Sequence, residues 1–262
     1  MQSPYIMENP LEAQRLSQKV DPALWLKTYI SPYIKPKFQI LDVGCGPGAL
    51  AAEIARHYSD IDINIVGLDI SEQRLEYARQ NFDISNLSFQ CANSKSLPFP
   101  IDSFDIVYSR FMLEYLDDPL RVVSEMARVC KPSGRIILQD IDGQLVSNFP
   151  TPEFDDDLQI LLGEMNKTGH DVFVGRKLFH FAKKAGLNNI TVKLEPYHLL
   201  AGKISEKDYK DWELKFEIAL PIAEKVLGPL KAKKLKDSFL EYLLREDTLT
   251  FSILFTVIGE VS

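Results

Sequence analysis

The sequence is poor in the residues that mark several classes of protein. Its 262 residues include only three cysteines and four histidines. Cys45, Cys91 and Cys130 are far apart and form no C-x-x-C pair, so neither a disulfide framework nor a zinc site is predicted. No apolar run approaches the length of a membrane span, and no basic segment followed by an apolar run opens the chain. We therefore expect no metal, no membrane partner and a cytoplasmic location.

An excess of positive charge is also missing. The chain has 30 lysines and arginines against 37 aspartates and glutamates, which gives a formal net charge of -7. This balance does not favour contact with a phosphate backbone, so we expect no nucleic-acid partner. The basic run Lys231, Lys233, Lys234 and Lys236 is interpreted as a solvated helix face.

Short apolar runs alternate with helical patterns between residues 38 and 140. Strands are predicted over 38–43, 63–69, 87–91, 104–109 and 135–140, and helices over 49–58, 72–81 and 120–129. Strands that alternate with helices indicate an α/β fold, with a mostly parallel sheet covered by helices on both faces. Ligands of such sheets bind at the carboxyl ends of the strands.

The first strand runs into a turn with three glycines, Gly44, Gly46 and Gly48, and a helix follows. Glycine permits the tight turn, and the free N–H groups of the helix start can bind a polar ligand. Asp69 ends the second strand, where one carboxylate can accept hydrogen bonds from both hydroxyls of a ribose. On its own, this pattern fits a dinucleotide such as NAD as well as other nucleoside cofactors.

Five blocks in a fixed order separate these possibilities. They are Leu41-Asp42-Val43-Gly44-Cys45-Gly46-Pro47-Gly48, then Asp69, Ser96-Leu97-Pro98-Phe99 with the following 102–107, Leu113 to Pro119, and Val129 to Arg135. In these blocks the chain resembles the class I S-adenosylmethionine (SAM)-dependent methyltransferases, in particular their small-molecule, UbiE-like branch. The resemblance implies a Rossmann-like sheet of seven strands, with the last strand antiparallel beside the fifth.

The resemblance also implies positions for the cofactor. Asp42 and the glycine loop would lie by the methionine portion, Asp69 by the ribose, Ile70 and the residues after the third strand by adenine, and the end of the fourth strand near the sulfonium. The cofactor-binding residues implied in this way are Asp42, Gly44, Cys45, Gly46, Asp69, Ile70, Ala92, Asn93, Ser94, Ser109 and Arg110. The chain departs from the family at Asn93, where relatives commonly carry an aspartate that accepts a hydrogen bond from adenine.

A second departure concerns the base. Relatives often carry histidine where this chain has Glu114-Tyr115, and Glu114 is either a substrate contact or a carboxylate at a helix start. His170, in a segment expected to overhang the sulfonium, is the best candidate for a general base.

We expect a methyltransferase that uses SAM, yields S-adenosylhomocysteine (SAH) and methylates a small molecule at oxygen, nitrogen or carbon. The alternatives are an NAD(P)-binding oxidoreductase and a non-catalytic binding protein on the same fold. Asp42 would repel a pyrophosphate, and a well-placed Tyr-x-x-x-Lys pair is missing, so the oxidoreductase is less favoured. The identity of the acceptor is left open.

The remaining segments are assigned by pattern, and a sixth strand is predicted over 190–195. We expect a helical cap over 1–36, a methyltransferase core over 37–199 with a lid near 141–175, a helical insertion over 200–247 and the last core strand over 248–262. Tyr209, Trp212, Phe216, Leu220 and Ala223 recur at helical spacing in the insertion. This stripe fits core packing, a substrate cap or a dimer face, so a monomer and a homodimer remain open.

Overall fold

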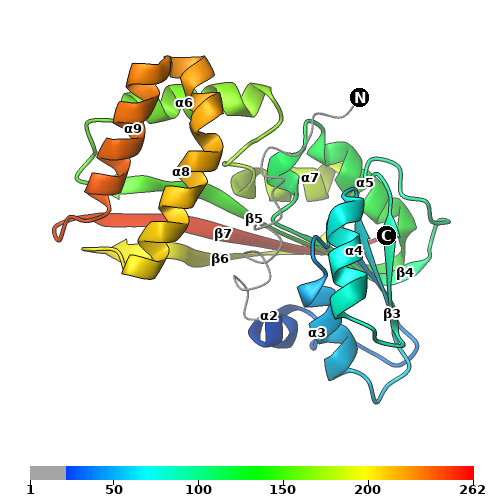
Figure 1. Ribbon diagram of the computed structural model, residues 1–262. Coiled ribbons are helices and arrows are strands. Elements are labelled where there is room, and N and C mark those ends of the chain that lie inside the picture. Colours follow the sequence, from blue (N-terminus) through cyan, green and yellow to red (C-terminus); the bar gives the residue numbers. More distant parts are fainter. Residues whose placement is uncertain (1–21) are drawn as a thin grey trace.

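The computed structural model describes residues 22–262 and contains one sheet of seven strands (Figure 1). Its strand order is β3-β2-β1-β4-β5-β7-β6, and β7 runs antiparallel to both of its neighbours. The strands are β1 Gln39–Val43, β2 Asn64–Asp69, β3 Leu87–Cys91, β4 Phe104–Arg110, β5 Cys130–Phe149, β6 Asn188–Ala201 and β7 Leu249–Glu260. The predicted α/β fold is confirmed, including the antiparallel last strand.

Helices cover both faces of the sheet. They are α2 Pro22–Tyr29, α3 Ala49–His57, α4 Glu72–Asn81, η1 Leu113–Tyr115, α5 Pro119–Val129, α6 Asp155–Lys167, η2 Gly175–Lys177, α7 Leu178–Lys184, α8 Glu206–Leu227 and α9 Pro229–Tyr242. Side chains of α2 and α3 pack on one face in a cluster around Ile40 and Ile106, and those of α5 and α7 pack on the other around Leu41 and Val107. The helical cap expected over 1–36 falls largely outside the described residues; its described part includes α2.

Two strands are longer than the sequence pattern predicts. β5 was expected to end at Asp140 and continues to Phe149, and its pairing with β7 shifts register between Asp142 and Ser147. This irregularity interrupts the alternation by which a strand is recognised. β6 was expected over 190–195 and extends to Ala201 through Pro196, which it tolerates because it is the edge strand of the sheet.

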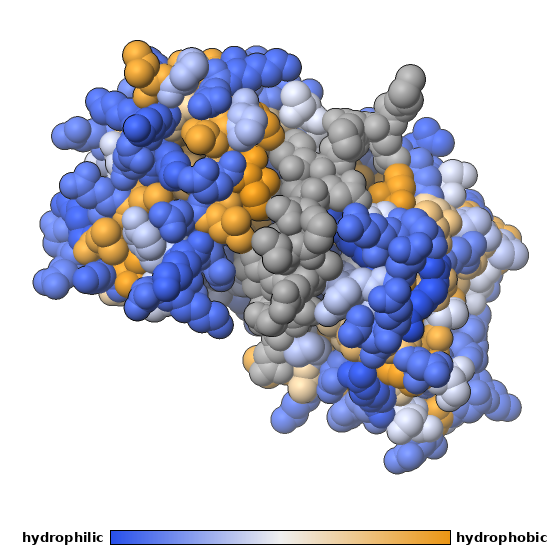
Figure 2. All heavy atoms as spheres, viewed as in Figure 1, coloured by the Kyte–Doolittle hydropathy of each residue, from blue (hydrophilic) through white to orange (hydrophobic). Residues whose placement is uncertain are grey.

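The extensions of β5, β6 and β7 support a second lobe, which we define by α6, α8, α9 and the far ends of these strands (Figure 1). Its core includes Trp212, Ala223 and Phe239, with Phe216 packed against it. The apolar stripe of the insertion therefore packs within the lobe. Figure 2 shows a mainly hydrophilic surface on this side, with apolar residues gathered on the lobe next to the middle of the molecule. No helix within residues 22–262 is long and apolar enough to cross a membrane.

Gly48 offers a test of the turn that starts α3. Its φ is +78°, and a Cβ there would lie 2.6 Å from the ring of Phe89. We expect Gly48→Ala to lower the free energy of unfolding by the left-handed strain of about 1 kcal/mol plus about 1–3 kcal/mol for the collision, measured by urea denaturation. Gly186→Ala is the matched control, since Gly186 has φ +84° and open space around its added Cβ. Equal losses in the two variants would contradict the packing argument.

Candidate active site

The glycine loop and the end of β2 are joined by one carboxylate. Asp69 Oδ2 accepts a hydrogen bond from the Gly46 N–H at 2.9 Å, and Oδ1 accepts one from the Ser71 N–H at 2.9 Å. The loop is also held by the N–H groups of Gly44 and Cys45, which both donate to the Leu68 carbonyl. Each oxygen of Asp69 keeps a second lone pair, and Asp69 lines a cavity. The carboxylate can therefore brace the loop and still accept hydrogen bonds from a ligand.

Asp42 lies at the buried end of β1, beside the same cavity. Burial raises the pKa of its carboxyl to about 7, the nearby Tyr108 hydroxyl partly offsets this, and the negative charge of Asp69 adds to it. Burial, followed by the charges of Asp42 and Asp69, also raises the pKa of the Cys45 thiol well above its ordinary value, so this thiol is protonated at neutral pH. This end of the cavity thus holds two carboxyl groups in a poorly solvated environment.

The other positions implied for the cofactor divide into two groups. Ile70, Ala92, Ser94 and Arg110 line the cavity together with the loop residues Gly44, Cys45 and Gly46. Asn93 and Ser109 are not among the lining residues. The side-chain oxygen of Asn93 accepts a hydrogen bond from the Lys95 N–H at 2.9 Å, and Ser109 is only 1% exposed. Contact of these two side chains with a ligand would need a local rearrangement.

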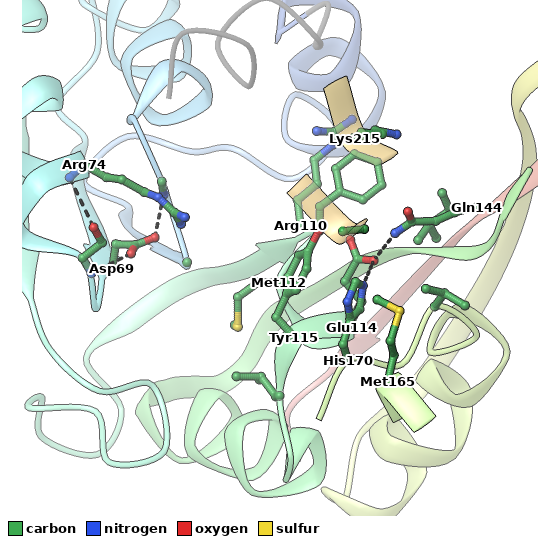
Figure 3. Close-up of a pocket in the computed structure, with 18 of the residues that line it drawn as sticks. Asp69, Arg74, Arg110, Met112, Glu114, Tyr115, Gln144, Met165, His170 and Lys215 are labelled. Carbon is green, nitrogen blue, oxygen red and sulfur yellow. Dashed lines mark hydrogen bonds and ion pairs between the residues drawn. The ribbon is translucent and has the colours of Figure 1, made fainter. Parts of the chain in front are cut away.

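The cavity has a volume of about 770 Å³ and runs from the core into the lobe (Figure 3). Asp69 lies toward one end of the view, and Glu114, Gln144, Met165 and His170 lie toward the other. We call the part of the cavity away from Asp69 and the glycine loop its lobe half. The walls there are mainly apolar and come from β5, α6, α8 and α9. They include Ile141, Val146, Leu158, Leu161, Leu162, Met165, Trp212, Phe216 and Phe239. Since ligand pockets usually measure about 300–1,000 Å³, this space suits a cofactor together with a second small molecule.

A buried polar cluster stands in the lobe half of the cavity. Gln144 Nε2 donates to Glu114 Oε2 at 2.8 Å, and His170 Nε2 lies 3.6 Å from the same oxygen. Within the described residues neither ring nitrogen of His170 has a hydrogen-bond partner, although only 6% of the side chain is exposed. The ring of Tyr115 packs on the imidazole at 4.8 Å between centroids. A buried imidazole with unsatisfied nitrogens in a cavity is suited to a ligand that completes its hydrogen bonds.

The backbone around this cluster is held by buried aspartates on β5. Asp140 accepts hydrogen bonds from the N–H groups of Leu113 at 2.9 Å and Glu114 at 3.3 Å, which fixes the turn η1. The Asp171 N–H donates to the Glu114 carbonyl at 2.7 Å, so the residue after His170 is tied to the same turn. Burial and then the charge of Glu114 raise the pKa of Asp140 well above its ordinary value. The side chain of Arg176 forms an ion pair with Asp142, the second of these aspartates.

Sequence reasoning missed most of the lobe half of the cavity. Gln144 contacts Glu114 across 30 residues of sequence, and no motif marks it. Trp212 and Phe216 lie on the apolar stripe of the insertion, which signals burial but does not say which members face a cavity. His170 and Glu114 were singled out separately, and the structure brings them together.

The raised pKa of Asp42 predicts a dependence of stability on pH. Between pH 4 and pH 7 the unfolded chain releases this proton and the folded chain keeps it, so the free energy of unfolding falls as the pH rises. The resulting decrease in the free energy of unfolding, on the order of 4 kcal/mol, is complete above pH 7. We expect Asp42→Asn to be more stable than the wild type at pH 8 and to lose this advantage near pH 4, measured by thermal unfolding. Asp102→Asn, at an exposed position, controls for the lost charge; an advantage of Asp42→Asn that does not vary with pH would contradict the assignment.

Comparison with known proteins identifies the family. The profile described as "Methyltransferase domain" matches residues 41–138. An uncharacterized methyltransferase of Schizosaccharomyces pombe is 30% identical over 161 residues, which are 58% of this chain and 57% of that protein. The ubiquinone biosynthesis O-methyltransferase of Neisseria meningitidis is 30% identical over 62% of this chain and 69% of its own length. The chain spans about half the length of the first curated relatives that it matches.

The fold of the chain is similar to that of a solved structure. The crystal structure of the YcgJ protein from Bacillus subtilis superposes with a TM-score of 0.60 at 19% identity, over 92% of this chain and 98% of the other. The strand order, the glycine loop and the aspartate at the end of β2 therefore agree with the comparisons of sequence and of fold. The chain belongs to the class I SAM-dependent methyltransferases.

Proposed function

We propose that the protein transfers a methyl group from SAM to a small molecule bound in the lobe half of the cavity. The observation that carries this proposal is the continuity of the cavity, which joins Asp69 and the glycine loop to the apolar chamber of the lobe. When bound, the cofactor supplies a methyl group on a positively charged sulfur, ready for in-line displacement. The protein then has to align the acceptor atom and exclude water.

The residues at the core end fit this cofactor. A Cβ built on Gly46 meets nothing within 4 Å, and Gly46 lines the cavity, so bare backbone forms the wall where a ligand would approach. We assign Asp42, Gly44, Cys45 and Gly46 to the methionine portion and Asp69 to the ribose. Ile70, Ala92, Asn93 and Ser94 are assigned to adenine, and Ser109 and Arg110 to the neighbourhood of the sulfonium.

The lobe half indicates the kind of acceptor. Its walls are aliphatic and aromatic, and its polar groups gather at Glu114, Gln144 and His170. Such walls favour a molecule with an apolar body and a polar group placed at the cluster. Glu114 is positioned to stabilise the imidazolium that forms when His170 takes a proton.

A hydroxyl is the acceptor group that needs such a base most, because a neutral alcohol or phenol is a weak nucleophile. We therefore favour oxygen as the acceptor atom, with the hydroxyl proton passing to His170 as the new carbon–oxygen bond forms. The relative from Neisseria meningitidis, an O-methyltransferase by name, supports this choice. Transfer of the methyl group to nitrogen or carbon instead of oxygen would be revealed by the product of the acceptor experiment described next.

The acceptor can be found directly. The protein is incubated with a metabolite extract and SAM carrying a labelled methyl group, and products that gain the label are identified by mass spectrometry. A labelled methyl ether would support the proposal. Failure of the protein to bind SAH, together with binding of NADH in calorimetry, would favour the oxidoreductase.

Asp69 provides the first test of the cofactor assignment. We expect Asp69→Ala to weaken SAH binding at least about tenfold, because the ribose and the Gly46 N–H both lose their acceptor. Calorimetry measures the affinity. Glu72→Ala, an exposed carboxylate in the first turn of α4, is the control and should bind SAH normally. Unchanged affinity in Asp69→Ala would refute the ribose assignment.

His170 provides the test of the base. Once an acceptor is known, we expect His170→Gln to lower kcat by about 10²- to 10⁴-fold, since general base catalysis is worth that much. SAH binding should stay unchanged, because the histidine stands in the lobe half. His180→Gln, on α7, controls for the loss of a histidine elsewhere. If the variant keeps its kcat, the acceptor loses its proton by another route.

A further inference from the structure

Arg110 is a cation set into the wall of the cavity, with no ion pair to any of the residues that the structure describes. It ends β4, its Nε donates to Gln139 Oε1 at 2.7 Å, and its guanidinium stacks on Phe111 at 4.1 Å from the ring centroid. The two terminal amino groups donate to no side chain or carbonyl of residues 22–262. A guanidinium stays charged in proteins, so a half-buried one whose terminal amino groups have no partner among these residues is suited to an anionic ligand.

Asp42 stands close by with the opposite charge. β1 and β4 are parallel neighbours in which Asp42 pairs with Tyr108, two residues before Arg110. Burial raises the pKa of Asp42 and lowers that of Arg110, and each charge acts on the other. The two side chains nevertheless form no ion pair, and both line the cavity that the glycine loop also lines. A carboxylate and a guanidinium held apart in this way complement the ammonium and carboxylate of one amino acid.

The orientation of the Arg110 guanidinium is fixed by its hydrogen bond to Gln139. Gln139 is fully buried on β5, and its Oε1 accepts hydrogen bonds from Arg110 and from Trp25 Nε1, the latter at 2.8 Å. Its Nε2 donates to Thr256 Oγ1 on β7 at 2.7 Å, which fixes which end of the amide faces Arg110. Trp25 lies on α2 and packs its ring on Tyr108. The terminal amino groups are thereby left to face the cavity.

We propose that Arg110 binds the carboxylate of the cofactor's methionine portion through its terminal amino groups, and that Gln139 and Trp25 are positioning residues for this contact. The inference rests on the proposed function, because it takes SAM and SAH as the ligands. It assigns to helix α2, which lies outside the matched methyltransferase region of residues 41–138, a part in cofactor recognition.

The test compares SAH with decarboxylated SAH, S-adenosyl-3-thiopropylamine, which keeps the ammonium and lacks only the carboxylate. Calorimetry measures both affinities for the wild type, Arg110→Leu and Arg110→Lys. We expect Arg110→Leu to weaken SAH binding about 10- to 100-fold, as the loss of a charge-assisted pair does, and to leave decarboxylated SAH unchanged. Arg110→Lys should fall between, since it keeps the charge and loses the fork.

The positioning residues are tested by the same ratio of affinities. Trp25→Phe removes the indole N–H together with part of the ring, and Gln139→Leu removes the acceptor for Arg110 Nε; both should reduce the preference for SAH over its decarboxylated form. Merely structural damage would weaken both ligands alike. Tyr58→Phe is the matched control, because it deletes a hydrogen bond to Ser31 beside α2 without touching Gln139, and its preference should equal that of the wild type.

Four other results of the calorimetry would each contradict part of the inference. Equal weakening of both ligands in Arg110→Leu would refute carboxylate recognition. No weakening of either would refute it as well and would leave the guanidinium for an acidic group on the acceptor. A wild-type protein that binds neither ligand would instead refute the proposed function. An unchanged preference in both Trp25→Phe and Gln139→Leu would refute their positioning role alone.

Discussion

The carboxylate of Asp69 connects the pieces from which the core end of the cavity is built. It receives one N–H from the turn after β1 and one from the start of α4, so two loops that are separate in sequence are held at one strand end. With both oxygens engaged, the turn at Gly46 keeps its left-handed shape and its bare backbone toward the cavity. The start of α3, directly after this turn, depends on that geometry.

In the lobe half, two buried aspartates on β5 likewise hold separate segments together by hydrogen bonds. Asp140 holds the backbone of η1 and with it Glu114, and Asp142 holds Arg176 at the start of the segment that leads into α7. Because η1 in turn binds the backbone next to His170, three segments converge on one polar cluster. Buried carboxylates are costly unless their hydrogen bonds are satisfied, and here backbone N–H groups and one guanidinium satisfy them.

The sequence predicted the parts that are local and failed where contacts are distant. The strand, the glycines and Asp69 follow one another within a βαβ unit, so spacing alone places them at one sheet edge. Asn93 was placed correctly after β3, yet it does not line the cavity, and its oxygen accepts a hydrogen bond from the Lys95 N–H, which a motif cannot reveal. Gln144 sits in the irregular part of β5, where the alternation of a strand is broken. The extension of β6 through Pro196 was missed because proline ends most strands, although an edge strand accepts it.

The long strands have a consequence for how the two halves of the cavity are held. β5 and β7 both pass from the core into the lobe, and their pairing extends from Arg135 and Glu260 to Phe149 and Leu249, with one shift of register between Asp142 and Ser147. A lobe joined by flexible linkers could change its distance from the core freely, but one built on a shared ladder can do so only by bending the sheet. The spacing between the two ends of the cavity is therefore set by strand register, and the side chains that α6, α8 and α9 contribute can change without moving the glycine loop or Asp69.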